Sequence, residues 1–132
     1  MDVGGHVGQY AVLLASLVSE SGRVITFEPD PMALTSLRKN LELNGFSERV
    51  KIEALALFDE AGEHRFFSKG ADSMSSLART GLGANAAATD VLEYSVKTIR
   101  LDDYLAARDL TPPSFIKLDL SLIHISEPTR PY

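Results

Sequence analysis

The first half of the chain alternates between segments of strand and helix character. Residues 9–21 are apolar on nearly every side, which predicts a helix covered on more than one face. Residues 23–28 are rich in β-branched and aromatic side chains and predict a strand. Leucines spaced three and four apart predict a second helix that starts at Asp30-Pro31 and ends at Asn44-Gly45. Residues 50–55 alternate between apolar and polar and predict another strand.

A strand stub at residues 1–3 completes an order of strand, helix, strand, helix, strand, which implies parallel strands with right-handed crossovers. Farther along, residues 64–67 and 94–100 predict two strands that pair as a hairpin. A short helix at 101–108 and a strand at 114–119 follow. We therefore expect an α/β fold built on a partial doubly wound, Rossmann-like sheet, with an additional antiparallel hairpin.

Composition narrows the classes of function. The chain has 132 residues, 45% of them hydrophobic, which suits one domain with a packed core. Its net charge of −5, without a cluster of basic residues, argues against nucleic-acid and membrane partners. It has no cysteine and its three histidines are far apart, so we expect no metal. The longest apolar run, Tyr10–Val18, is too short to span a bilayer, and we expect a cytoplasmic protein.

Ligands of doubly wound sheets bind at the carboxyl ends of the strands, where the strand order reverses. The segment Asp2-x-Gly4-x-x-x-Gly8 lies between the first strand and the first helix. Glycines there let the backbone approach a ligand, and a helix N-terminus offers free amides. Taken alone, the segment is equally typical of a tight turn, with His6 as a solvated turn residue.

Two carboxylates follow at the ends of neighbouring strands. Glu28 ends the second strand, where it can accept hydrogen bonds from both ribose hydroxyls of a nucleoside. Asp59 follows the third strand, where it is either an acceptor for an adenine amino group or a turn residue. Alone, Glu28 is more often a solvated strand end, but its place twenty residues after Gly8 predicts a nucleoside-containing ligand.

The spacing of the glycines discriminates between two candidate cofactors. A dinucleotide site carries G-x-G-x-x-G, whereas here Gly4 and Gly8 lie four apart and His6 takes the place of a middle glycine. A diphosphate needs the closest approach of the backbone, and a nucleoside without phosphates does not. The spacing therefore favours S-adenosylmethionine over NAD.

Six segments together resemble the FkbM-type methyltransferases, which are class I S-adenosylmethionine enzymes. They follow the family's order over residues 2–119, and they are DVGGHVGQY (2–10), VITFEPDP (24–31), LRKNLELNG (37–45), SMSSL (73–77), TIRLDDYL (98–105) and FIKLD (115–119). The resemblance implies methyl transfer to a hydroxyl oxygen of a small-molecule acceptor, a sugar or a secondary metabolite. It also implies a parallel sheet of order 3-2-1-4, in which strand four is residues 114–119.

The resemblance further implies roles for individual residues. Those that would hold the cofactor are Asp2, Gly4, Gly5, His6, Gly8, Glu28 and Asp59. Asp119 ends the strand beside the first and is the implied catalytic residue. It would act as a general base toward a hydroxyl, which is a weak acid, so that positioning supplies most of the rate.

The last residues depart from the family, which continues after Lys-x-Asp with a Val-Glu-Gly-like turn. Leu120 to Arg130 match, over eleven consecutive residues, the in-frame translation of a transposon-end sequencing adapter. We therefore expect residues 1–119 to be the N-terminal part of a class I methyltransferase domain, and residues 120–132 to be a non-native tail. Three alternatives stay open: an NAD-binding dehydrogenase domain, a non-enzymatic nucleoside-binding module, and an inactive gene fragment. The sequence indicates no oligomeric state.

Overall fold

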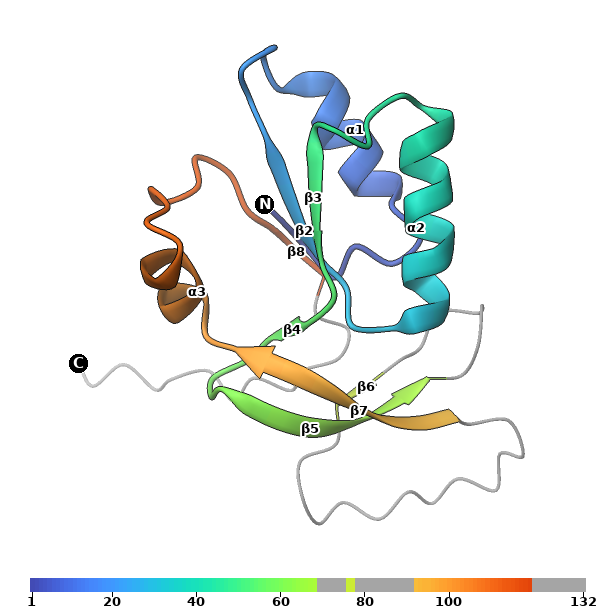
Figure 1. Cartoon of the computed structure of the whole chain (residues 1–132), viewed down its shortest axis with the longest axis vertical. Coiled ribbons are helices and arrows are strands. Elements are labelled where there is room, and N and C mark those ends of the chain that lie inside the picture. Colours follow the sequence, from blue (N-terminus) through green and yellow to red (C-terminus); the bar gives the residue numbers. More distant parts are fainter. Residues whose placement is uncertain (69–75, 78–91, 120–132) are drawn as a thin grey trace, which may run out of the picture.

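The computed structural model describes residues 1–68, 76–77 and 92–119, which form two sheets and three helices (Figure 1). The first sheet is parallel and has the order β3-β2-β1-β8. Its strands are β1 (Asp2–Val3), β2 (Val24–Phe27), β3 (Val50–Glu53) and β8 (Lys117–Leu118). The predicted α/β fold and the strand order 3-2-1-4 are confirmed, with β8 as the fourth strand.

The helices cover both faces of this sheet. Helices α1 (Gln9–Leu17) and α2 (Pro31–Leu43) lie together on one face, and α3 (Leu101–Ala107) lies on the other (Figure 1). The core under α1 and α2 consists of Ala11, Ala15, Val24, Leu37, Leu41 and Val50. The core under α3 consists of Val3, Phe27 and Tyr104. Successive side chains of β2 therefore point to opposite faces of the sheet, as expected for a strand.

Helix α2 forms for the reasons that its sequence gives. The Asp30 carboxylate caps it by accepting the Met32 amide hydrogen at 2.8 Å, and Pro31 occupies the first turn, where no amide is needed. Its apolar stripe is buried on the sheet at Leu34, Leu37 and Leu41. The chain leaves the helix through Gly45, whose φ of +71° favours glycine.

Helix α1 departs from the prediction in its length and in its surroundings. It ends at Leu17 instead of residue 21, because residues 19–22 form a turn in which the Gly22 amide donates to the Ser19 carbonyl at 2.9 Å. Its outer face is also open, since Leu13 is 49% and Leu17 is 71% exposed. The expectation of a helix covered on more than one face is therefore wrong for the described part of the chain.

The second sheet contains the predicted hairpin and two strands that were not predicted. Strands β5 (Gly62–Ser68) and β7 (Leu92–Ile99) pair antiparallel along the whole length of β5. Strand β4 (Ala56–Leu57) joins β7 in parallel, and β6 (Ser76–Leu77) joins β5, which gives the order β4-β7-β5-β6. β4 and β6 were not predicted, because two residues are too few to show a periodic pattern in the sequence.

The predicted strand at 114–119 is reduced to two residues, because β1 offers it a partner of the same length. Among the helices of residues 1–68 and 92–119, none has the length and apolar character to cross a bilayer. The proposed tail at 120–132, and the first three residues of the SMSSL segment, lie outside the described residues.

Candidate functional site

The glycine loop, residues 4–8, joins the carboxyl end of β1 to helix α1 and is fixed by hydrogen bonds on two sides. The amides of Gly4 and Gly5 both donate to the Phe27 carbonyl at 3.0 Å, which ties the loop to the end of β2. The Asn40 side chain of α2 donates to the Val7 carbonyl at 2.8 Å. These hydrogen bonds tie the loop to β2 and to α2.

The glycines are required by the packing of the chain itself. Gly4 has a φ of +80° and Gly8 a φ of +92°, a region that residues with a side chain rarely adopt. A Cβ atom on Gly4 would overlap the backbone carbonyl of Asp119, and a Cβ on Gly8 would lie 3.2 Å from the Cγ of Leu37. On Gly5 it would overlap the hydroxyl oxygen of Thr26. The predicted contact of these glycines with a cofactor stays a prediction.

Glu28 lies directly after β2 and is only 5% exposed. Its Oε2 accepts the His6 amide hydrogen at 2.7 Å, and its Oε1 accepts the Asp30 amide hydrogen at 2.8 Å. Burial raises the pKa of Glu28, and these two hydrogen bonds oppose that rise. His6 thus takes part through its backbone, with a φ of +48°.

On the other side of the loop, Lys117 of β8 lies between two carboxylates. Its Nζ is 3.3 Å from Asp2 Oδ1 and 3.6 Å from Asp119 Oδ2. The Asp2 side chain is fully buried, and its Oδ2 accepts the Thr26 hydroxyl at 3.2 Å. Burial raises the pKa of Asp2, whereas the nearby Lys117 ammonium acts to lower it. The structure therefore brings Asp2, the glycine loop, Glu28 and Asp119 to one end of the parallel sheet.

Asp59 is not part of this group. It is exposed and lies in the turn between β4 and β5, at the second sheet. Its neighbour Phe58 donates its amide hydrogen to the Ile99 carbonyl, at the end of β7. In Figure 1 this turn lies well away from the loop between β1 and α1. Its predicted role beside an adenine stays a prediction.

Sequence reasoning missed Lys117 and Thr26 as members of the site. Both face Asp2 directly, because the strand register pairs Asp2 with Thr26 on β2 and with Lys117 on β8. A signal was present, since each is a polar residue within a strand otherwise dominated by apolar residues. To recognise that both residues lie beside Asp2, one needs the register of the strands, which a sequence alone does not supply.

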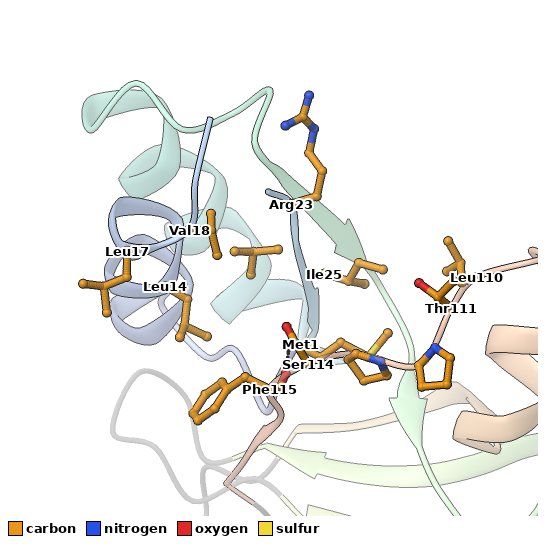
Figure 2. A pocket seen from close by; sticks show the side chains of 13 residues that line it. Met1, Leu14, Leu17, Val18, Arg23, Ile25, Leu110, Thr111, Ser114 and Phe115 are labelled. Atoms are coloured by element: carbon orange, nitrogen blue, oxygen red, sulfur yellow. Dashed lines mark hydrogen bonds between the residues drawn. The ribbon is translucent and has the colours of Figure 1, made fainter. Parts of the chain in front are cut away.

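A separate apolar pocket of about 670 Å³ opens at the amino ends of the parallel strands, opposite the candidate site. Figure 2 shows side chains of α1 on one side of it and the segment before β8 on the other. Arg23 is the one charged side chain among its lining residues. Because the lining comes from the amino ends of β1, β2 and β8, this pocket is distinct from the candidate site.

The candidate site offers carboxylates and backbone groups and no set of metal ligands. Among the residues that the structure describes, no three His, Asp or Glu side chains gather where they would hold a metal ion. A glycine loop and a buried carboxylate at adjacent strand ends are typical of sites for nucleoside cofactors.

Neither the curated proteins nor the solved structures include a significant match to the chain. A comparison with protein families, in contrast, agrees with this arrangement. The family model described as "Methyltransferase FkbM domain" matches residues 2–120, which include both strand ends and the glycine loop. The chain therefore belongs to the FkbM methyltransferase family.

Proposed function

We propose that the chain binds S-adenosylmethionine and catalyses transfer of its methyl group to a hydroxyl oxygen of a sugar or a secondary metabolite. The observation that carries the proposal is the buried Glu28 carboxylate at the end of β2, which is hydrogen-bonded to the glycine loop at His6. Membership of the FkbM family supports methyl transfer as the reaction. The identity of the donor and of the acceptor atom is our inference.

The residues present fit a nucleoside with an amino-acid arm. Each oxygen of Glu28 accepts one backbone hydrogen bond, and a carboxylate has about four acceptor positions, so capacity remains for the two hydroxyls of a ribose. Gly4 and Gly8 place no side chain over the loop. Helix α1 begins at Gln9 without a side-chain cap, which leaves its first amides available as donors.

When bound, S-adenosylmethionine supplies an electrophilic methyl carbon on a sulfonium sulfur. The part of the chain is to hold and orient the reactants: Glu28 at the ribose, and the glycine loop at the amino-acid arm. Asp119, whose side chain is 59% exposed at the end of β8, accepts the proton of the acceptor hydroxyl. The donor would thereby supply the methyl group for the new C–O bond and would be released as a neutral thioether.

Calorimetric titration of the full chain with S-adenosylmethionine, and separately with NAD, tests the choice of cofactor. We expect saturable binding of S-adenosylmethionine and weaker or no binding of NAD. Tighter binding of NAD would contradict the proposal and favour the dinucleotide alternative. The acceptor class is tested by transfer of a labelled methyl group to a panel of hydroxylated small molecules. Each is compared with its deoxy analogue, which should remain unlabelled.

A further inference from the structure

Lys117 touches four structural elements at the point where the strand order reverses. Besides the carboxylates of Asp2 and Asp119, its Nζ reaches the Gly4 carbonyl at 3.2 Å. It also lies over the ring of Tyr10, 4.4 Å from the ring centroid. The Lys117 side chain is only 15% exposed, so these contacts replace much of its hydration. One ammonium group thus connects β1, the glycine loop, helix α1 and the end of β8.

The charges in this cluster are unevenly distributed. Asp2 and Asp119 both face the Lys117 ammonium group, and the terminal ammonium of Met1 adds a weaker attraction that acts on Asp2. The two carboxylates differ in their access to solvent, since the Asp2 side chain is fully buried and the Asp119 side chain is 59% exposed. Lys117 lies closer to the buried partner, so the less compensated negative charge lies at Asp119, at the open side of the cluster.

This uneven distribution bears on the choice of ligand. A donor with a sulfonium centre carries a positive charge that its thioether product lacks. A negative charge held at the end of β8 stabilises the charged form relative to the neutral form, because the Coulomb interaction acts on one of them only. Lys117 keeps that charge in place through its contacts and limits its size by compensating one of the two carboxylates.

We propose that Lys117 is a positioning residue that fixes the Asp119 carboxylate at the switch point, and that the net charge of the cluster sets the site's preference between a cationic sulfonium and a neutral thioether. This inference rests on the proposed function, because it concerns the same site. It assigns to Lys117 a role that is separate from ribose binding at Glu28.

The test compares the affinities for S-adenosylmethionine and S-adenosylhomocysteine, which differ by one methyl group and one charge. Both are titrated calorimetrically into the full chain and into variants, and the quantity measured is the ratio of the two affinities. A general loss of structure weakens both ligands together, so the ratio reports the local charge. We expect Asp119→Asn to lower the relative affinity for S-adenosylmethionine by about fivefold. Lys117→Met should raise it, and Lys117→Arg should leave it near the wild-type value.

Lys51→Met is the matched control, since Lys51 is an exposed lysine paired with Glu53 at the end of β3. It should leave the ratio unchanged. If the wild-type chain binds both ligands and Asp119→Asn does not alter the ratio, this inference is overturned while the proposed function stands. If the wild-type chain binds neither ligand, the proposed function fails and the inference fails with it. Should Lys117→Met not fold, the ratios of Asp119→Asn and Lys117→Arg still decide.

Discussion

The carboxylate of Glu28 accepts the backbone amide hydrogen of His6 at 2.7 Å, across twenty-two residues of chain. Through this bond the end of β2 supports the glycine loop that follows β1. The group that we expect to hold the ribose is therefore also the group that fixes the loop. Substitution of Glu28 will act on binding and on stability together, and an experiment has to separate the two effects.

Glu28→Gln should weaken binding of S-adenosylmethionine by about 1–3 kcal/mol, because an amide nitrogen replaces one acceptor oxygen within a buried network. Glu53→Gln is the matched control, since Glu53 ends the neighbouring strand β3 and accepts the Tyr104 hydroxyl hydrogen at 2.7 Å. Only the first variant should lose affinity, whatever the change in stability of either. Calorimetry well below the unfolding temperature of each variant measures this. Equal losses of affinity would contradict the role of Glu28.

The contributions of Glu28 and Glu53 to the free energy of unfolding should change with pH in opposite directions. Burial raises the pKa of Glu28, so the folded state holds this proton more tightly than the unfolded chain does. Its contribution to the free energy of unfolding is then full below the ordinary value of 4.5 and is lost as the pH rises through the raised pKa. For Glu53, burial is outweighed by its partners Lys51, Tyr104 and Arg108, and its pKa is lowered. Its contribution is present above 4.5 and is lost as the pH falls through the lowered pKa.

Denaturant unfolding of the wild type, Glu28→Gln and Glu53→Gln between about pH 3 and pH 7 measures both contributions. The difference between wild type and Glu28→Gln should shrink as the pH rises, and the difference for Glu53→Gln should grow. Two slopes of the same sign would contradict the burial that the structure assigns to Glu28.

Tyr104→Phe should lower the free energy of unfolding by about 1.5–3 kcal/mol, the usual contribution of a hydrogen bond to a charged group. Tyr104 is fully buried, donates to Glu53, and packs edge-on against Phe27 with ring centroids 4.9 Å apart. Tyr104→Ala also leaves a cavity and should cost more, about 3–5 kcal/mol. Thermal unfolding followed by circular dichroism checks the order. An effect of Tyr104→Ala no larger than that of Tyr104→Phe would show that α3 does not depend on this ring.

Gly8→Ala should destabilise the chain more than Gly45→Ala does. Both glycines have a positive φ, so an alanine at either position costs about 1–2 kcal/mol in backbone strain. A Cβ atom on Gly45 would meet nothing within 4 Å, whereas one on Gly8 would press on Leu37. The difference between the two variants, measured by denaturant unfolding, isolates this contact. Equal losses would mean that Leu37 moves aside freely.

The elements that the sequence predicted well are those whose signals are local. The Asp30-Pro31 start of α2 and its leucine stripe need neighbours only a few residues away, and both are confirmed. The period-two pattern of β7 likewise matches the burial of Val96 and Thr98. Resemblance to a family supplied what periodicity could not, the 3-2-1-4 order of the strands in the parallel sheet.

What the sequence did not predict depends on distant parts of the chain. The pairing of Lys117 with Asp2 depends on a register between strands more than a hundred residues apart. Asp59 follows the third strand in sequence, but β4 carries the chain into the second sheet first. Local patterns do not contain these facts.

The last prediction concerns the free edge of β8. Among the described strands, β8 pairs with β1 on one side and lies at the edge of the sheet on the other. Its surroundings are apolar, since Phe115 is 58% and Leu118 is 61% exposed. An apolar strand edge of this kind promotes association between molecules, and a lysine on such an edge suppresses it.

We therefore expect the chain to self-associate as its concentration rises, and Leu118→Lys to weaken that association by about tenfold or more, the effect of exposing one buried leucine. Leu43→Lys is the control, because Leu43 ends α2 and is 72% exposed away from this edge. Size-exclusion chromatography over a range of concentrations measures the change. A chain that stays monomeric throughout, or one in which both lysine variants behave alike, would show that β8 is not the surface that associates. If the chain associates and both lysine variants behave alike, the exposed apolar residues of α1, Leu13 and Leu17, become the next surface to test.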